Sequence, residues 1–327
     1  MANPSIYSER KYLVTGGCGF IGSNLARTLA KRGAQVTAVD NIQSGVAENL
    51  RDSEVQFLAA DVTESRNWLA GGPLSQLTGV QWDAVFHHGD ITDPRHGDDE
   101  KVYQRNTSGF QNVLDLALKR KCRLVFASTA GLYGNGAVPM REDQPNHILT
   151  AYGKSKAEME RRAVEAGTRI PVIGLRYFNV YGPREGHKGR AASMIFHLFH
   201  QMTAGKNPRL FEFGEQKRDF VYVKDIVAAN LCALTAPSGI YNVGSGEAEE
   251  FNAVVAALNT AMGTALETEF FKMPYDPATY QMNTHADMSK AKSQLGFTPQ
   301  WNLKAGVMDY VHWLQAANNQ SGVSRSL

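Results

Sequence analysis

The chain has 327 residues, of which 43% are hydrophobic and 20% are charged, the balance of an ordinary water-soluble folded protein. Its 34 lysines and arginines nearly match 32 acidic residues, so the net charge of +2 does not indicate binding to nucleic acid or to an anionic membrane. This composition excludes a disordered tail, a collagen-like fibre and a coiled coil. The length allows about two domains of ~150 residues.

The sequence shows no targeting or cross-linking pattern. Its apolar runs are shorter than the ~18 residues that cross a bilayer, and residues 1–11 lack the apolar stretch of a signal peptide. Cys18, Cys122 and Cys232 are widely separated, without the spacing of a disulfide framework or a metal site. We therefore expect a cytoplasmic protein with no membrane partner.

Short β-branched runs alternate with helical patterns through the first half of the chain. We expect strands at 12–15, 35–39, 55–59, 84–87, 124–127 and 172–177, and helices at 21–32, 98–119 and 151–166. This alternation predicts an α/β fold with βαβ units and a Rossmann-type, doubly wound parallel sheet that has helices on both faces.

The second half is less regular. Residues 179–190 are rich in glycine, proline and charge and indicate a functional loop. Beyond it we expect a helix at 193–203, strands at 220–223 and 240–243, and a terminal helix at 303–315. We assign residues 1–178 to the Rossmann domain and 179–327 mainly to a smaller, intertwined C-terminal domain, with elements near 219–245 returning to the first.

A glycine cluster between the first strand and the first helix predicts a dinucleotide site. Gly16, Gly19 and Gly22 allow a tight turn and let a pyrophosphate approach the unpaired N–H groups of the helix N-terminus. Asp40 ends the second strand, where a carboxylate accepts hydrogen bonds from the ribose hydroxyls of NAD and repels a 2′-phosphate. Asp61, followed by Val62, is either an adenine contact or an ordinary acidic residue at a strand end.

A tyrosine and a lysine at positions i and i+4 predict proton-transfer chemistry. Tyr152 and Lys156 share one helix face, and Thr129 follows the end of an earlier strand. A free tyrosine with a pKa of about 10 is a poor base, but an adjacent ammonium lowers that pKa. The Thr129 hydroxyl would hold the substrate oxygen beside Tyr152. The alternative is a solvated Tyr–Lys pair on the helix surface.

These motifs together resemble the extended short-chain dehydrogenase/reductases, which modify nucleotide-activated sugars. The resemblance runs from Tyr12 to about Leu314 and includes the segments 176–183 (RYFNVYGP) and 218–225 (RDFVYVKD). It implies that Asn179 and Arg218 contact the diphosphate of the substrate. An amide donor and a guanidinium suit such a group.

The stretch from Gly182 to Gly189 more closely resembles the ADP-L-glycero-D-manno-heptose 6-epimerases, as do residues 192–197 and 210–212. In that family the lysine after Gly-His is a second catalytic acid/base, a role that falls here on Lys188. The alternative for Lys188 is a mobile cationic residue near the diphosphate. A sugar dehydratase is excluded, because Ala130-Gly131 stands where that branch has an Asp-Glu pair.

The resemblance therefore implies two sets of contacts. The expected cofactor contacts are Gly16, Gly19, Phe20, Ile21, Gly22, Asp40, Asn41, Asp61, Val62, His88, Asn106, Tyr152, Lys156, Val180 and Lys188. The expected substrate contacts are Ser128, Thr129, Asn179, Arg190, His197, Phe211, Arg218 and Tyr280. His197 could instead face a core and Tyr280 could be a packed aromatic. The family is usually oligomeric, which implies a homo-oligomer.

The expected reaction is transient oxidation at C6″ of an ADP-linked heptose by tightly bound NAD or NADP, followed by reduction on the opposite face. Charge at Asp40 and the absence of a lysine at Ala47 favour NAD, whereas the family precedent favours NADP. Two alternatives remain: a UDP-hexose 4-epimerase, and a dinucleotide-sensing protein that has lost its chemistry.

Two segments depart from the heptose epimerases. Arg190 replaces a small polar residue, and residues 88–93 (HGDITD) replace the usual acidic-Gly-Ala sequence. Histidines and acids in this region do not predict a metal site, because the adjacent His87 and His88 point to opposite faces of a strand. We expect no metal, since oxidising a carbinol with NAD needs no Lewis acid.

Overall fold

The central sheet is parallel and combines six strands from residues 1–178 with one strand from the rest of the described chain. The computed structural model describes residues 7–93, 97–273 and 281–323. In this part of the chain the sheet has the order β11-β6-β5-β4-β1-β2-β3. Its strands are β1 (Lys11–Thr15), β2 (Gln35–Asp40), β3 (Gln56–Ala59), β4 (Ala84–His87), β5 (Arg123–Thr129), β6 (Val172–Tyr177) and β11 (Gly239–Val243). The predicted Rossmann-type fold is confirmed.

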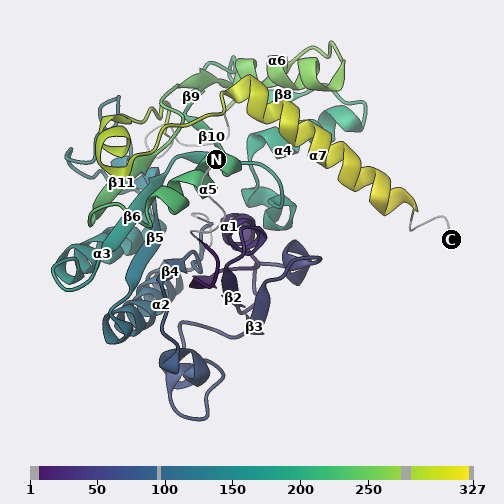
Figure 1. Cartoon of the computed structure of the whole chain (residues 1–327). Helices are drawn as coiled ribbons and strands as arrows, with labels where there is room; N and C mark the ends of the chain where they lie inside the picture. Colours follow the sequence, from purple (N-terminus) through teal and green to yellow (C-terminus); the bar gives the residue numbers. More distant parts are fainter. Residues whose placement is uncertain (1–6, 94–96, 274–280, 324–327) are drawn as a thin grey trace.

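Helices cover both faces of the sheet (Figure 1). α1 (Phe20–Lys31) and α5 (Val223–Cys232) pack on one face, and α2 (Asp99–Arg120) and α3 (Ala151–Ala166) pack on the other. Each helix buries an apolar stripe at helical spacing, as Leu25, Ala26 and Leu29 of α1 do. Because both faces are covered, the strands read as continuous hydrophobic runs.

A smaller unit lies beside the sheet, at the top and right of Figure 1. It contains α4 (Met194–Thr203), α6 (Phe251–Met262) and α7 (Leu303–Val323), which share a third hydrophobic core. Its short strands pair as β7 (Asn179–Tyr181) with β10 (Phe220–Tyr222), β8 (Arg209–Phe211) with β13 (Glu269–Phe271), and β9 (Lys217–Arg218) with β12 (Glu249–Glu250).

Short helical turns connect these elements. The 3₁₀ turns are η2 (Ala47–Leu50), η3 (Ser65–Trp68), η4 (Ser75–Gly79), η5 (Ala130–Tyr133) and η6 (Gly186–Ala191), and η7 (Ala291–Leu295) is a π-helical turn. Within the described ranges, the helices lack the combination of length and apolar character that crossing a membrane requires.

The second half differs from its prediction in three places. The expected strand at 220–223 ends at Tyr222, because Val223 already begins α5. The helix α6 was not predicted, although its buried positions 251, 254, 255 and 258 have helical spacing. The expected loop at 179–190 starts with the strand β7 and ends in η6, since the residues of β7 pair in parallel with β10.

The strand order reverses between β1 and β4, whose neighbours are β2 on one side and β5 on the other. In doubly wound sheets, ligands bind at this point, outside the carboxyl ends of the strands. The segments that leave these ends are the glycine cluster, Asp40, the stretch after His87, and Thr129. The fold therefore brings together most of the residues that carry the predicted chemistry.

Candidate active site

The glycine cluster forms a tight turn that only glycine fits. Gly16 has a φ of 65°, and a Cβ there would lie 2.4 Å from the carbonyl oxygen of His88. A Cβ on Gly22 would lie 2.1 Å from the carbonyl oxygen of Gly16. Gly19 is the N-cap of α1, and the first turn carries no acidic side chain. The exposed N–H groups of this helix end suit a pyrophosphate, so the cradle fits the dinucleotide expected from the sequence.

Asp40 lies at the carboxyl end of β2 and is tied to the glycine turn. One carboxylate oxygen accepts a hydrogen bond from the backbone N of Cys18 at 3.0 Å, and the other accepts one from Ile42 N at 2.8 Å. These bonds orient the carboxylate at the edge where a ribose would lie. Nearby, burial and the Asp40 charge raise the pKa of the Cys18 thiol to about 12, so this thiol stays neutral.

Asp61 is held by its neighbours at the end of β3. Asn41 Nδ2 donates to its carboxylate at 3.0 Å, Thr63 Oγ1 donates at 2.7 Å, and Arg105 forms an ion pair with it. Burial opposes ionisation, but hydrogen bonds from these three residues lower the pKa of Asp61 to about 2. Asn41 and Asp61 therefore act on each other in this structure, beside the buried Val62.

Thr129, Tyr152 and Lys156 meet at the carboxyl ends of β5 and β6. Tyr152 and Lys156 lie one turn apart on α3, and the Lys156 Nζ lies 5.6 Å from the centroid of the Tyr152 ring. A hydrogen bond joins Tyr152 to Thr129. Thr150 caps the helix by accepting a hydrogen bond from Gly153 N at 3.1 Å, which fixes where the first turn presents Tyr152.

The electrostatics of Tyr152 differ from the prediction. Burial raises the pKa of Tyr152 above its ordinary value, Lys156 opposes that rise, Asp90 adds to it, and the hydrogen bond from Thr129 opposes it. The net result is an elevated pKa, whereas the i, i+4 lysine alone predicted a lowered one. The main reason is the burial of the phenol, and the carboxylate of Asp90 beside the lysine adds to it.

The stretch after β4 packs against both the glycine turn and α3. His88 stacks on Tyr177 with ring centroids 6.1 Å apart, and burial, with the nearby His87 and Lys156, lowers its pKa to about 3. Asn106 of α2 is 1% exposed and holds this stretch by bonding both the N and the O of Ile91, at 2.8 and 3.0 Å. The side chain of Asn106 therefore supports the loop directly.

The two segments that we expect to depart from the heptose epimerases contact each other. Arg190 donates from Nε and Nη2 to one carboxylate oxygen of Asp93, at 3.1 and 2.9 Å. Arg190 belongs to η6, and Asp93 belongs to the stretch that follows β4. The bridge therefore joins two loops that border the carboxyl edge of the sheet.

Lys188 lies over the start of α1. Its Nζ is 5.3 Å from the centroid of the Phe20 ring, and burial lowers its pKa while the nearby Glu185 opposes that change. Glu185 is fully buried and accepts hydrogen bonds from Gly182 N and from Ser193 at both N and Oγ, which fixes the fold of this loop. Lys188 thus sits beside the pyrophosphate cradle.

The expected substrate residues occupy different environments. Asn179 is exposed, and its Oδ1 accepts a hydrogen bond from Thr284 at 3.0 Å. Arg218 is 7% exposed and lies over the Phe251 ring, with its Nη1 donating to the Lys217 carbonyl. Ile21 and Val180 pack on the apolar cores.

Ser128 points into a buried ion pair. Its Oγ donates to Glu160 Oε1 at 2.5 Å, and Glu160 also pairs with Arg176. Ser128 is 2% exposed, so its hydroxyl serves this internal network in the structure. Tyr280 lies outside the described residues.

One cavity of about 490 Å³ contains His197. Its lining consists of Met194, His197, His200, Gln201, Ala204, Lys206, Arg209 and Phe271. Phe211 lies next to it, with its ring centroid 6.0 Å from that of Phe271. Four of these side chains carry basic groups, so the cavity favours an anionic or electron-rich occupant.

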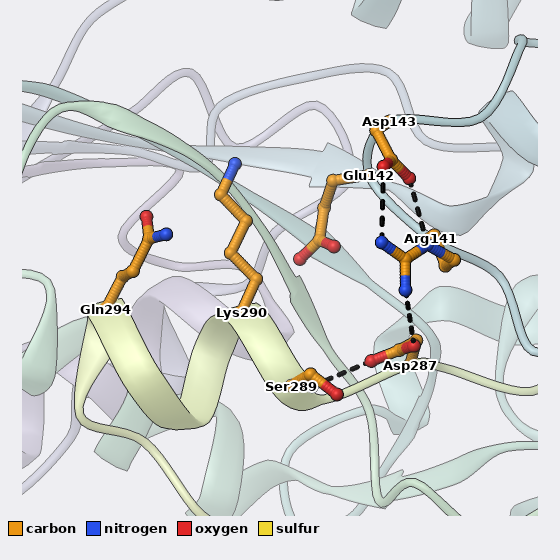
Figure 2. A pocket seen from close by; sticks show the side chains of 7 residues that line it. All are labelled: Arg141, Glu142, Asp143, Asp287, Ser289, Lys290 and Gln294. Carbon is orange, nitrogen blue, oxygen red and sulfur yellow. Dashed lines mark hydrogen bonds and ion pairs between the residues drawn. The ribbon is translucent and has the colours of Figure 1, made fainter.

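A second cavity, of about 310 Å³, lies apart from the predicted residues (Figure 2). It is lined by Arg141, Glu142, Asp143, Asp287, Ser289, Lys290 and Gln294. Arg141 bridges Asp143 and Asp287, so its charge is already paired. Among the described residues, no group of three or more histidines, cysteines and acids is arranged to hold a metal ion.

The parallel sheet, the glycine cradle and the Thr–Tyr–Lys set define an NAD-dependent enzyme of the extended short-chain dehydrogenase/reductase class. Residues 12–244 match the model of the NAD dependent epimerase/dehydratase family, and the chain belongs to this family. The predicted class of enzyme is thereby confirmed.

Individual relatives narrow the comparison. The chain is 34% identical over 313 residues to an ADP-L-glycero-D-manno-heptose-6-epimerase of Brachyspira hyodysenteriae, covering 93% of this chain and 97% of the relative. A crystal structure of the Helicobacter pylori ADP-L-glycero-D-manno-heptose-6-epimerase matches with a TM-score of 0.88 and 33% identity, covering 97% of this chain and 99% of that one. The UDP-glucose 4-epimerase of Thermus thermophilus in complex with NAD matches with a TM-score of 0.80 and 28% identity, over 92% and 98% of the two chains.

Proposed function

We propose that this protein is a nucleotide-sugar epimerase that inverts C6″ of an ADP-linked glycero-manno-heptose. The main support for this proposal is that Tyr152, Lys156 and Thr129 lie together at the carboxyl edge of the sheet, beside the glycine cradle. The relatives named as heptose epimerases align over nearly the whole chain and support this sugar over a hexose.

Each residue has a distinct role in this proposal. A dinucleotide bound at the glycine cradle supplies the acceptor and donor of hydride. Tyr152 exchanges a proton with the sugar hydroxyl, and Thr129 holds the reacting oxygen beside it. Lys156 places a positive charge next to the tyrosine and the nicotinamide ribose. Lys188 serves the opposite face of the sugar as the second acid/base, for which its burial favours the free amine.

The remaining contacts follow from their positions. We propose that Asn179 and Arg218 bind the diphosphate, and that the cavity containing His197 receives the nucleoside end of the substrate. We propose that Arg190, which pairs with Asp93 through Nε and Nη2 and is 66% exposed, also contacts the substrate. We also propose a homo-oligomer, as the resemblance implies.

The substrate test offers ADP-glycero-manno-heptose and UDP-glucose separately, without added reductant, in deuterated water. We expect NMR of the sugar to show interconversion of the two heptose epimers, with the C6″ hydrogen retained because the same hydride returns. Conversion of UDP-glucose alone would support the 4-epimerase alternative. The absence of any interconversion, with dinucleotide still bound, would support the dinucleotide-sensing alternative.

We propose that NAD is the tightly held cofactor. Replacing Asp40 with alanine should weaken the binding of NAD. It should also reduce or reverse the preference for NAD over NADP, because the carboxylate that repels a 2′-phosphate is lost. The measurement is the dissociation constant of each dinucleotide for the stripped protein. Asp52→Ala is the matched control, since Asp52 lies on the surface after η2 and should leave both constants unchanged. Unchanged discrimination in Asp40→Ala would contradict this role.

A further inference from the structure

A buried ion pair between Lys156 and Asp90 lies next to Tyr152. Lys156 Nζ donates to Asp90 Oδ2 at 2.6 Å and to the Ala127 carbonyl oxygen, also at 2.6 Å. Both side chains are 1% exposed. An ion pair at this depth is shielded from water, so each charge depends on the other. Removing one partner would leave the other buried without compensation.

Asp90 also lies close to side chains of the neighbouring strands. Its Oδ1 lies 3.5 Å from His87 Nε2, and His87 Nδ1 lies 2.7 Å from the Thr15 hydroxyl at the end of β1. The row of side chains therefore runs from the first strand of the sheet, through β4, to α3. This row ends at Asp90, which with the Ala127 carbonyl oxygen sets where the Lys156 ammonium lies.

Other ionisable groups also face this pair. Glu160 of α3 acts on Lys156 through its charge, His88 is influenced by both Asp90 and Lys156, and Tyr177 of β6 is influenced by Tyr152. His88 stays neutral at ordinary pH, since burial lowers its pKa to about 3. Asp90 stays ionised: burial raises its pKa, but Lys156 and His87 lower it by more.

The charge balance changes what the lysine does to the tyrosine. A lone ammonium beside a phenol favours the phenolate, and a carboxylate paired with that ammonium weakens this effect. In this protein burial is the largest cause that raises the pKa of Tyr152, and the carboxylate of Asp90 adds to it against the opposing charge of Lys156. The resting tyrosine is therefore a phenol, and Asp90 contributes to keeping it protonated.

We propose that Asp90 is a positioning residue of this epimerase, which anchors Lys156 against the end of β5 and offsets part of its charge beside Tyr152. This inference builds on the proposed function: while Tyr152 is protonated, the Lys188 amine takes the proton of the sugar hydroxyl as hydride leaves C6″, and Tyr152 donates its proton to the carbonyl oxygen when hydride returns. Asp90 acts through Lys156 and does not itself contact the substrate.

The test is the ionisation of Tyr152 in Asp90→Asn, which keeps the size of the side chain and removes its charge. The phenolate is followed by near-ultraviolet absorbance as the difference from the corresponding Tyr152→Phe protein. We expect its midpoint to fall by about one pH unit or more, the effect of losing a charge within ~4–6 Å. The basic limb of kcat/KM, where the phenol is lost, should shift to lower pH in parallel. NAD binding should survive.

Asp93→Asn is the matched control, because it removes a carboxylate from the same stretch that pairs with Arg190 and not with Lys156. Its phenolate midpoint should equal that of the unaltered protein. An unchanged midpoint in folded Asp90→Asn would overturn the proposal. If that variant does not fold, NMR titration of labelled tyrosine in the unaltered protein decides: the proposal requires a midpoint above the ~10 of free tyrosine. A lower value would refute it.

This measurement is independent of the sugar. The phenolate titration needs no substrate, so a shift in Asp90→Asn would stand even if the heptose assignment failed. Conversely, if the protein epimerises the heptose but the phenolate midpoint does not shift in Asp90→Asn, the proposed function would stand and the role of Asp90 would be refuted.

Discussion

Tyr152→Phe should lower kcat by about 10²–10⁴, because the sugar hydroxyl then has no phenol with which to exchange its proton. The ring remains, so its packing beside Lys156 and the fold of α3 should be preserved. The reaction is followed as interconversion of the heptose epimers at saturating substrate. The melting temperature should remain close to that of the unaltered protein.

Tyr241→Phe is the matched control for this change. It also removes a tyrosine hydroxyl: Tyr241 lies on the edge strand β11, and its hydroxyl donates to the Pro237 carbonyl just before that strand. We expect near-normal turnover from this variant. Normal turnover in Tyr152→Phe would remove the tyrosine from the proton-transfer step and leave Lys188 as the acid/base to examine.

Arg176→Met should destabilise the protein by about 3–5 kcal/mol, because it leaves the carboxylate of Glu160 buried and uncompensated. Arg176 is 4% exposed and Glu160 is 7% exposed. Their two hydrogen bonds measure 2.9 and 2.7 Å and join β6 to α3, the helix that carries Tyr152. The free energy of unfolding, from urea denaturation, is the measurement.

A double variant separates the ion pair from packing. Arg176→Met combined with Glu160→Leu removes both charges and should be more stable than Arg176→Met alone, since no buried charge remains unpaired. Arg161→Met provides a surface control on the same helix, where the ion pairs with Glu158 and Glu165 are solvated. If Arg176→Met lowered the free energy of unfolding no more than Arg161→Met does, Glu160 would have another partner that compensates its charge.

Much of the fold could be predicted because its signals are local. Alternating strands and helices, with glycine at the first turn and an acid ending the second strand, indicate a doubly wound sheet. The helices α5 and α6 were missed for different reasons. Val223 continues the apolar run of β10, so the sequence does not mark where β10 ends and α5 begins. The buried positions of α6 have a clear helical period, so this helix could have been predicted.

The candidate site was predictable where a motif fixes both the residue and its element. Tyr152 and Lys156 share a helix face because of their spacing, and Thr129 follows a strand end. Pairings between distant segments had no such signal. Asp90 meets Lys156 across 66 positions, Asp93 meets Arg190 across 97, and Ser128 turns inward to a glutamate 32 residues away. An acidic residue following β4 is the one clue that could have pointed to Asp90.

The bridge between Arg190 and Asp93 restricts how this protein can be re-engineered. Both residues lie in segments where we expect a departure from the heptose epimerases, and they pair with each other across two loops. A loop grafted from another protein would arrive without its counterpart and lose this contact between the two loops. We therefore expect a chimaera that exchanges both loops together to keep the contact, whereas exchanging one loop alone removes it.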